Sequence, residues 1–182
     1  MPIILYASKF IKRKNPVKLL EAFAKIAQDE NPPKAYLLYI GSGEDKVLLE
    51  NRIKELGWGE NVKLLGFKNQ SELPLYISMC DVFVLPSNKE PYGLIVNEVL
   101  NCAKPVITTT EVGAAKDLII HGENGFIYKP EDIDSLAMYL KMFIQDRALS
   151  ISMGKKSINI INEWSYKYNV NGIYEALKGL RK

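Results

Sequence analysis

Cysteine and histidine are scarce in this sequence, which contains two cysteines and one histidine among 182 residues. Cys80 and Cys102 lack a second Cys or His at the short spacing of zinc and redox motifs, so we expect no metal site. Two isolated thiols also cannot form the disulfide framework of a small secreted domain, which favours a reduced, cytoplasmic protein. We interpret His121, in the run Ile-His-Gly-Glu-Asn-Gly, as a turn residue ahead of a short strand and not as a catalytic group.

Long apolar runs and a large surplus of one charge are also lacking. No run approaches the roughly 18 apolar residues of a membrane-spanning helix. The first predicted strand begins at Ile3, too early to leave room for a targeting segment. Lys and Arg outnumber Asp and Glu by only 24 to 21, without a basic stripe that carries interleaved aromatic residues. We therefore expect neither a transmembrane segment nor a nucleic-acid partner.

Short apolar runs that alternate with helical patterns are what the sequence does contain. Strands are predicted over 3–7, 35–40, 62–66, 82–85, 104–109 and 126–128. Helices are predicted over 16–26, 44–56, 71–80, 91–100, 131–144, 148–161 and 165–180. This alternation predicts an α/β fold with a doubly wound, mostly parallel sheet of about six strands and helices on both faces. Residues 1–182 are expected to form a single domain with a sizeable core.

The stretch 81–98 reads as strand, loop and helix in direct succession. Val82 to Leu85 is an apolar run typical of a buried parallel strand. Pro91 suits the first position of a helix, because its ring pre-sets φ. The amides of Tyr92, Gly93 and Leu94 would then lack intrahelical acceptors and face the carboxyl edge of the sheet. This pattern predicts a site for phosphate or sugar oxygens, which the missing side chain of Gly93 would let approach closely.

Two carboxylates, Glu90 and Glu98, bracket that predicted helix start. The segment 94–100 is apolar nearly all round, so Glu98 is expected to be partly buried and to need a partner. At the helical rise the two would be roughly 12 Å apart, comparable with an extended nucleotide sugar. The alternative is that Glu90 is a solvated loop acid and that Glu98 bonds a structural neighbour. The spacing alone does not decide, because Glu123 and Glu131 repeat it.

Two further loops follow predicted strands. Residues 8–14 carry four positive charges, on Lys9, Lys12, Arg13 and Lys14, and leave the carboxyl end of the first strand, where open α/β sheets bind ligands. A solvated surface loop is the alternative. The Gly-Ser-Gly run at 41–43 lacks a third glycine at dinucleotide spacing, so we expect a tight turn there and no nicotinamide or flavin site.

The run Glu-Pro-Tyr-Gly-Leu-Ile-Val-Asn-Glu at 90–98, preceded by Asp-Val-Phe-Val-Leu-Pro-Ser and followed by Pro-Val-Ile at 105–107, resembles glycosyltransferase family 4. This is the "glycosyl transferases group 1" family of retaining GT-B enzymes, and the resemblance is to its carboxyl-terminal, donor-binding half. It implies a Rossmann-like domain of a transferase that moves a sugar from a UDP, GDP or ADP sugar to an acceptor. No cofactor and no metal are implied.

The resemblance also assigns roles to residues. Lys9 and Lys14 match the positions where an Arg and a Lys grip the donor diphosphate, although Lys at position 9 lacks the bidentate fork of Arg. Glu90 would contact the hydroxyls of the donor sugar, and Glu98 the ribose. The remaining donor-binding positions are Gly66, Phe67 and Lys68 in the base-side loop, with Tyr92, Gly93, Leu94 and Ile95. The family's usual Gly-Gly-x-x-Glu reads Gly-Ala-Ala-Lys-Asp at 113–117, so Ala114 and Asp117 depart from it.

The amino-terminal, acceptor-binding half of a GT-B enzyme is expected to be missing, which would leave a donor domain inactive by itself. The helices over about 148–180 would pack on this domain or on the missing one, with Trp164, Tyr166, Tyr168 and Tyr174 either partly exposed or packed on their own sheet. Peripheral membrane attachment would come through the missing domain. The leading alternative is a noncatalytic nucleotide-sugar-binding module that acts with a separate partner, and a weaker one is a sugar-nucleotide epimerase of related architecture.

Overall fold

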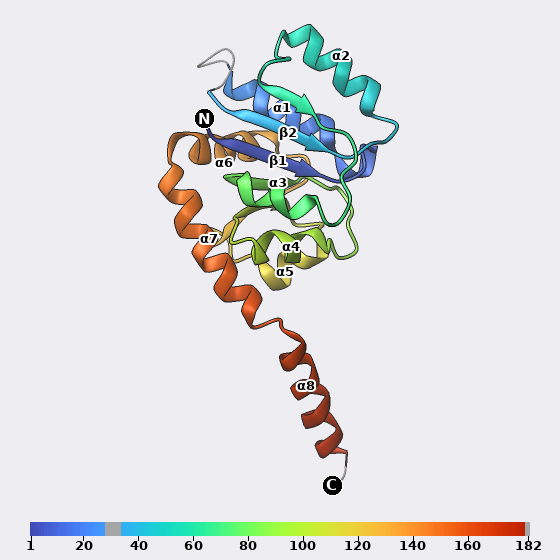
Figure 1. Ribbon diagram of the computed structural model, residues 1–182, viewed down its shortest axis with the longest axis vertical. Coiled ribbons are helices and arrows are strands. Elements are labelled where there is room, and N and C mark those ends of the chain that lie inside the picture. The colour runs from blue at the N-terminus through green and yellow to red at the C-terminus, as the bar shows by residue number, and fades with distance from the viewer. Residues whose placement is uncertain (28–33, 181–182) are drawn as a thin grey trace.

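The computed structural model describes residues 1–27 and 34–180, which form a three-layer α/β domain followed by a projecting helix (Figure 1). The strands are β1 (Ile3–Ala7), β2 (Tyr36–Ile40), β3 (Val62–Leu64), β4 (Val82–Leu85), β5 (Val106–Thr109) and β6 (Gly125–Tyr128). The helices are the 3-10 helix η1 (Lys12–Lys14) and α1 (Pro16–Ile26), α2 (Lys46–Leu56), α3 (Leu73–Met79), α4 (Ile95–Asn101), α5 (Gly113–Leu118), α6 (Ile133–Gln145), α7 (Arg147–Asn162) and α8 (Tyr166–Gly179).

The six strands of the described residues form one parallel sheet in the order β3-β2-β1-β4-β5-β6. The predicted doubly wound α/β class is therefore confirmed. β1 lies in the middle, paired with β2 through Leu5 and Leu38 on one side and with β4 through Leu5 and Phe83 on the other. Strand order reverses between β1 and β4, and the carboxyl ends of these two strands flank the usual ligand crevice of such sheets.

Alternate residues of the strands feed two hydrophobic cores on opposite faces of the sheet. Tyr6 and Val84 point into a core shared with α1, α2 and α6. Leu5 and Phe83, their neighbours in sequence, point into a core shared with α3, α4 and α5. Because both faces are covered, the strands need apolar residues at consecutive positions, which explains why they read as continuous apolar runs.

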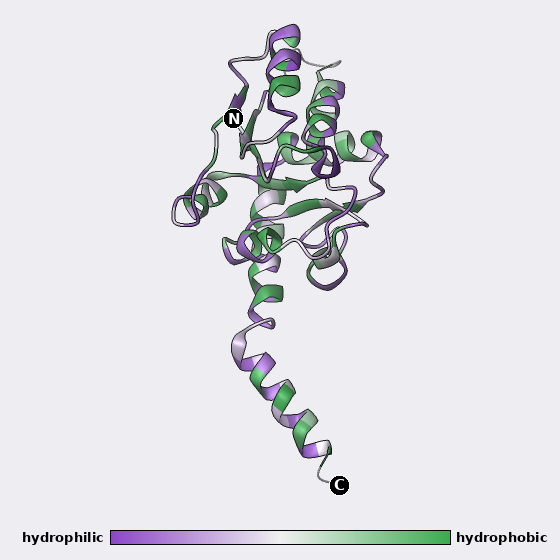
Figure 2. Ribbon diagram, turned by 90° about the vertical axis from the view of Figure 1, so that its right-hand side faces the viewer, coloured by the Kyte–Doolittle hydropathy of each residue, from purple (hydrophilic) through white to green (hydrophobic). Residues whose placement is uncertain are grey.

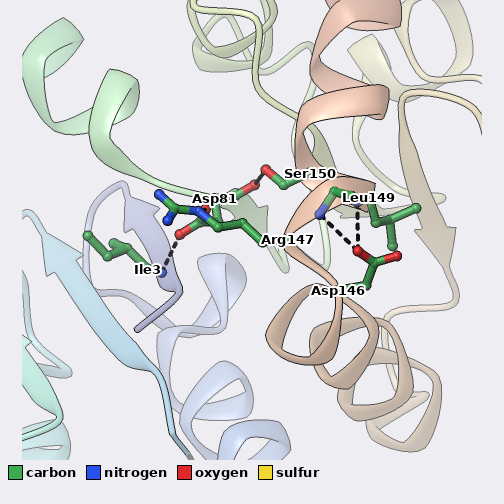
Figure 3. Close-up of polar contacts among 7 residues, drawn as sticks. Ile3, Asp81, Asp146, Arg147, Leu149 and Ser150 are labelled. Atoms are coloured by element: carbon green, nitrogen blue, oxygen red, sulfur yellow. Dashed lines mark hydrogen bonds and ion pairs between the residues drawn. The ribbon is translucent and has the colours of Figure 1, made fainter.

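A buried aspartate holds the amino-terminal edge of the sheet together. Asp81 precedes β4, and its Oδ2 accepts a hydrogen bond of 2.8 Å from the N–H of Ile3 at the start of β1. Its Oδ1 lies 3.2 Å from Nε of Arg147 in α7, and its main-chain oxygen accepts a hydrogen bond from the Ser150 hydroxyl (Figure 3). One residue therefore links two strands and a covering helix.

The helix α7 crosses close to α4 where it carries a glycine. A Cβ on Gly154 would lie 2.0 Å from the carbonyl oxygen of Ala103, so no side chain fits there. Ala103 follows α4 and has a positive φ of 54°. Contact between the α7 main chain and this carbonyl therefore brings the two helices together more closely than side chains would allow.

The last helix, α8, projects from the domain and has no buried residue. Val170, Ile173, Tyr174 and Leu177 share one face of it and are 56–63% exposed. Figure 2 shows the apolar and polar bands of this helix away from the sheet. Of the two expectations for the aromatic residues, packing on their own sheet is wrong: Trp164 is 46% and Tyr166 is 91% exposed, and Tyr168 is 64% exposed.

The Asp81 contacts predict a stability difference between two substitutions. Asp81→Ala should lower the free energy of unfolding by about 1–3 kcal/mol, because the Ile3 N–H loses its acceptor. Arg147→Ala should cost less than about 1 kcal/mol, since the Arg147 side chain is 79% exposed. Urea unfolding of both variants tests this, and equal losses would contradict the role given to the Ile3 hydrogen bond.

Candidate functional site

The loop after β1 is fixed by main-chain contacts with the turn after β2. Ser8 N–H donates to the carbonyl of Ile40 (3.1 Å), and Phe10 N–H donates to that of Ser42 (2.9 Å). A Cβ on Gly41 would lie 2.0 Å from the carbonyl oxygen of Ser8, and one on Gly43 would lie 2.3 Å from that of Phe10. The Gly-Ser-Gly run is thus a turn required by close packing of two main chains, as predicted, and it holds Lys9 in place.

A cavity of about 500 Å³ opens at this edge of the sheet. It brings together the side chains of Lys9, Phe67 and Lys68, which sequence analysis assigned to two different loops. Its lining residues are Ala7, Ser8, Lys9, Ile40, Gly41, Ser42, Phe67, Lys68 and Leu73. Lys9 and Phe67 are exposed, Phe67 by 75%. This is a cavity with an apolar base and two cations, suited to a flat ring and an anionic group.

The base-side loop is shaped by its glycine. Gly66 has φ of 71°, in the left-handed region that favours glycine. Its carbonyl accepts a hydrogen bond of 2.9 Å from the N–H of Gly41, which joins this loop to the turn after β2. The ammonium of Lys68 lies 5.4 Å from the ring centroid of Tyr76. Phe67 and Lys68 are therefore presented at the cavity by a turn anchored on the sheet.

Lys14 and Glu90 form an ion pair on the same edge of the sheet. Their side chains are 11% and 13% exposed, so the alternative of Glu90 as a solvated acid is wrong. Glu90 is held extended, because its N–H donates to the carbonyl of Glu111 (3.0 Å) and its carbonyl accepts from Gly113 N–H (3.0 Å). Burial lowers the pKa of Lys14 to about 8, with Arg13 and Lys9 adding repulsion. The Glu90 carboxylate opposes that shift.

The helix expected to begin at Pro91 begins instead at Ile95, which corrects the sequence prediction. Glu90 forms a bridge with Val112, and the carbonyl of Tyr92 accepts a hydrogen bond of 2.7 Å from Ala114 N–H, so the chain is extended there. Gly93 then turns it with φ of 96°. The ring of Pro91 fixes its φ at a value that occurs both in helices and in extended loops, so the proline alone does not indicate a helix start. Glu90 is outside the helix, so the axial distance of roughly 12 Å expected from helical rise does not apply.

The free main-chain donors predicted for this segment are present, although the helix itself starts one turn later than expected. Within residues 1–27 and 34–180, hydrogen-bond acceptors are lacking for the N–H groups of Tyr92, Gly93 and Leu94, as predicted, and also for that of Ile95. Leu94 is 71% exposed, whereas Gly93 is buried. Tyr92 is half-buried. Because these N–H groups have no acceptor among the described residues, they are available to donate hydrogen bonds to an anionic or hydroxyl ligand.

Glu98 lies in the first turn of α4 and is half-buried, as predicted. Among the described residues its carboxylate has no hydrogen-bond or ion-pair partner. The alternative in which Glu98 bonds a structural neighbour therefore finds no support in this structure. An acid in this position is available to accept hydrogen bonds from hydroxyl groups.

Other expectations concern residues around the site. Asn15 occupies the N-cap position of α1, but its side chain makes no capping hydrogen bond. His121 lies in the turn before β6, and its Nδ1 accepts a hydrogen bond of 3.1 Å from Ile127 N–H. Ala114 is buried against the Tyr92 loop, whereas Asp117 is exposed.

Sequence analysis missed several residues that the structure places at the site. Ser42 and Leu73 line the cavity, and Asn88 bonds the loop that carries Lys14. Short polar or apolar side chains of this kind occur throughout the chain, so only their position at the ends of predicted strands could have indicated them. Across residues 1–27 and 34–180, no three His, Cys, Asp or Glu side chains gather as a metal site would require, and no helix is long and apolar enough to span a membrane.

Comparisons with known proteins agree with this geometry. The model of the family "Glycosyl transferases group 1" matches residues 1–160. The chain is 28% identical over 175 residues to the N-acetyl-alpha-D-glucosaminyl L-malate synthase of Bacillus anthracis, which covers 96% of this chain and 44% of that protein. The chain thus spans less than half the length of this curated relative.

Solved structures show the same fold. Anabaena HepE in complex with UDP superposes with a TM-score of 0.81 at 26% identity, over 97% of this chain and 48% of that one. The C-terminal domain of the glycosyl transferase group 1 family protein LpcC from Francisella tularensis, at 24% identity, matches in fold with a TM-score of 0.79, over 88% of this chain and 84% of that one. With its parallel sheet in the arrangement of the carboxyl-terminal domain of GT-B enzymes, the chain belongs to the glycosyl transferases group 1 family.

Proposed function

We propose that this chain is the donor-binding domain of a retaining glycosyltransferase and binds a nucleoside diphosphate sugar in the crevice beyond β1 and β4. The observation that carries the proposal is the buried Lys14–Glu90 pair, which lies at the crevice beside the cavity of Lys9, Phe67 and Lys68. A buried ion pair is costly to desolvate. Its position at the switch point is explained if a charged ligand uses it. The HepE structure, which contains UDP, supports this choice of ligand.

The two lysines would neutralise the diphosphate. Lys9 is exposed at the cavity, and it is close enough to Lys14 to help lower the pKa of that residue. A diphosphate between them would relieve their repulsion and would stabilise the charge that develops on the leaving group during transfer. The free N–H groups of Gly93, Leu94 and Ile95 would add uncharged donors to the same oxygens. Glu90, released in part from Lys14, would accept hydrogen bonds from the sugar hydroxyls.

The nucleoside would occupy the other side of the crevice. Glu98 would accept hydrogen bonds from the ribose hydroxyls, because its carboxylate has no other partner among the described residues. Gly66, Phe67 and Lys68 would contact the base, with main-chain groups for hydrogen bonding and the exposed Phe67 ring for stacking. Tyr92 would support the Gly93 turn. UDP, GDP and ADP sugars all fit this description.

The domain supplies one wall of a transfer site. Catalysis by positioning needs donor and acceptor held together away from water, and Lys9, Phe67 and Leu94 are exposed on the crevice side. The chain alone would therefore bind donor without transferring sugar, and a second domain would bring the acceptor. The exposed apolar face of α8 is available for contact with that domain. Turnover restored by such a domain separates this proposal from a noncatalytic nucleotide-sugar-binding module.

Substitution of the lysines tests the proposal. Lys9→Ala and Lys14→Gln should each weaken UDP binding about 10- to 100-fold, the range for bonds to a charged group, and leave uridine binding nearly unchanged. Gln at position 14 can still donate a hydrogen bond to Glu90. Calorimetric titration at ionic strengths of about 0.05 M and about 0.5 M should show that the loss of UDP affinity caused by each substitution is smaller at the higher ionic strength.

Lys12→Ala is the matched control, since Lys12 is an exposed cation of the same loop. It should leave UDP binding within about twofold, as a surface charge does. If Lys12→Ala weakens UDP binding as much as Lys9→Ala and Lys14→Gln do, the loop acts only as a diffuse positive patch and the assignment of residues is wrong.

The pKa of Lys14 predicts how UDP binding depends on pH. That pKa is lowered to about 8 by burial, Arg13 and Lys9, so the ammonium loses its proton as pH rises through about 8. UDP affinity should then fall, by up to about tenfold per pH unit if only the charged form binds. Lys14→Arg keeps its charge throughout this range. Its profile should be flat from about pH 7 to about pH 9, and a decline equal to that of the unsubstituted chain would refute the role of Lys14.

Glu98→Gln tests the ribose contact. The substitution removes the charge and keeps the shape, so UDP and uridine binding should both weaken by about 1–3 kcal/mol. 2′-Deoxyuridine lacks one of the two hydroxyls, so Glu98→Gln should weaken its binding less than it weakens the binding of uridine. The half-buried side chain has no partner among the described residues to lose, so the thermal midpoint should hardly move. Unchanged uridine affinity together with a large drop in that midpoint would identify Glu98 as a structural acid.

A further inference from the structure

Asn15 has an unusual main-chain conformation between η1 and α1. Its φ of 51° and ψ of 45° are left-handed, and only Ala103 shares a positive φ among the non-glycine residues in 1–27 and 34–180. Asparagine tolerates this conformation better than most residues, but glycine tolerates it best. The side chain of Asn15 is buried and does not cap α1. A reason other than helix capping must therefore explain an asparagine at this position.

The side chain of Asn15 reaches across to the loop after β4. Its Nδ2 donates to the carbonyl of Pro86 at 2.9 Å and also to Oδ1 of Asn88. In return, Asn88 N–H donates to the carbonyl of Arg13 at 2.8 Å, and the Arg13 guanidinium donates to the carbonyl of Lys89 at 3.2 Å. These four hydrogen bonds, called here the Asn15 clasp, close the loop after β1 onto the loop after β4.

The Asn15 clasp lies directly beside the ion pair of the proposed donor site. Asn15 follows Lys14 in the chain, and Asn88 is two residues ahead of Glu90. The loop after β4 is held from its other side as well, because the Thr109 hydroxyl donates to the carbonyl of Ser87 at 2.6 Å. Without the clasp, the connection between the loop that carries Lys14 and the loop that carries Glu90 would depend on that ion pair itself.

We propose that Asn15 is a positioning residue that fixes Lys14 and Glu90 relative to each other for the donor diphosphate. The inference rests on the proposed function, since it assigns Asn15 to the same site. Asn15 need not touch the ligand. Its amide joins the two loops before the ligand binds. The binding free energy of the ligand is therefore not reduced by the cost of ordering these loops. A strained main chain with a buried side-chain contact is typical of such functional positions.

Asn15→Gly is the informative substitution, because glycine keeps the positive φ and removes only the side chain. UDP binding should weaken about tenfold, and uridine binding should stay within about twofold. Asn88→Ala should have a smaller effect, since the bond from Asn15 to Pro86 remains. The two substitutions together should weaken UDP binding no more than Asn15→Gly alone, because they remove parts of one network.

Asn124→Ala is the matched control. Asn124 is also fully buried, and its Nδ2 also donates to a main-chain carbonyl, that of Leu118, at 2.9 Å. It lies ahead of β6, at the opposite edge of the parallel sheet from the crevice. Asn124→Ala should lower the thermal midpoint and leave the ratio of UDP to uridine affinity unchanged. A purely structural role of Asn15 would make Asn15→Gly behave in the same way, which would overturn the inference.

A second measurement reports on the clasp without any ligand. The Asn88 amide hydrogen, which bonds the Arg13 carbonyl, should exchange with solvent faster in Asn15→Gly than in the unsubstituted chain. Faster exchange with weaker UDP binding supports the inference. Unchanged exchange, or faster exchange with unaltered UDP binding, overturns it. If Lys14→Gln weakens UDP binding but Asn15→Gly does not, only the inference fails, whereas unaltered UDP binding by Lys14→Gln shows that the proposed function itself is wrong.

Discussion

The pairing of β1 with β2 on one side and β4 on the other is the constraint on which the rest of the structure depends. Both neighbours are parallel to β1, so their connections must cross opposite faces of the sheet, and the loops after β1 and β4 leave in different directions. Every residue proposed for the diphosphate and sugar lies on one of those loops or on the segment that follows it. The crevice is thus a consequence of strand order, and the side chains only give it chemical character.

Main-chain contacts define that crevice more than side chains do. Gly41 and Gly43 let the turn after β2 lie against the loop after β1, and Gly113 lets the loop after β5 lie against Pro91, whose oxygen would be 2.2 Å from a Cβ at position 113. Each loop is therefore supported by its neighbour in the sheet. A site built in this way needs little rearrangement to accept a charged ligand, which lowers the entropic cost of binding.

The strands were predictable because burial on both faces leaves a plain signature, and β4 was predicted at Val82 to Leu85 as observed. The start of α4 was not predictable, because Pro91 is compatible with both a helix and an extended chain. The chain is extended there because Glu90 forms a bridge with Val112, which is distant in the sequence. Lys14 and Glu90 were each predicted as site residues, but no sequence pattern gives a contact between residues so far apart. The same limit applies to α8, because the sequence pattern gives its apolar face but does not show that this face is left exposed.

The contact of Gly154 with Ala103 has an effect at a distance. α7 is a single helix that continues to Asn162, so its direction is set where its main chain touches that carbonyl. From Gly154 to the helix end is roughly 12 Å at the usual rise, and a tilt of about 10° would move that end by about 2 Å. α8 starts just beyond. A methyl group at position 154 would therefore re-aim the outgoing helix, so the alignment of this domain with anything bound to α8 depends on how closely α7 packs against the end of α4.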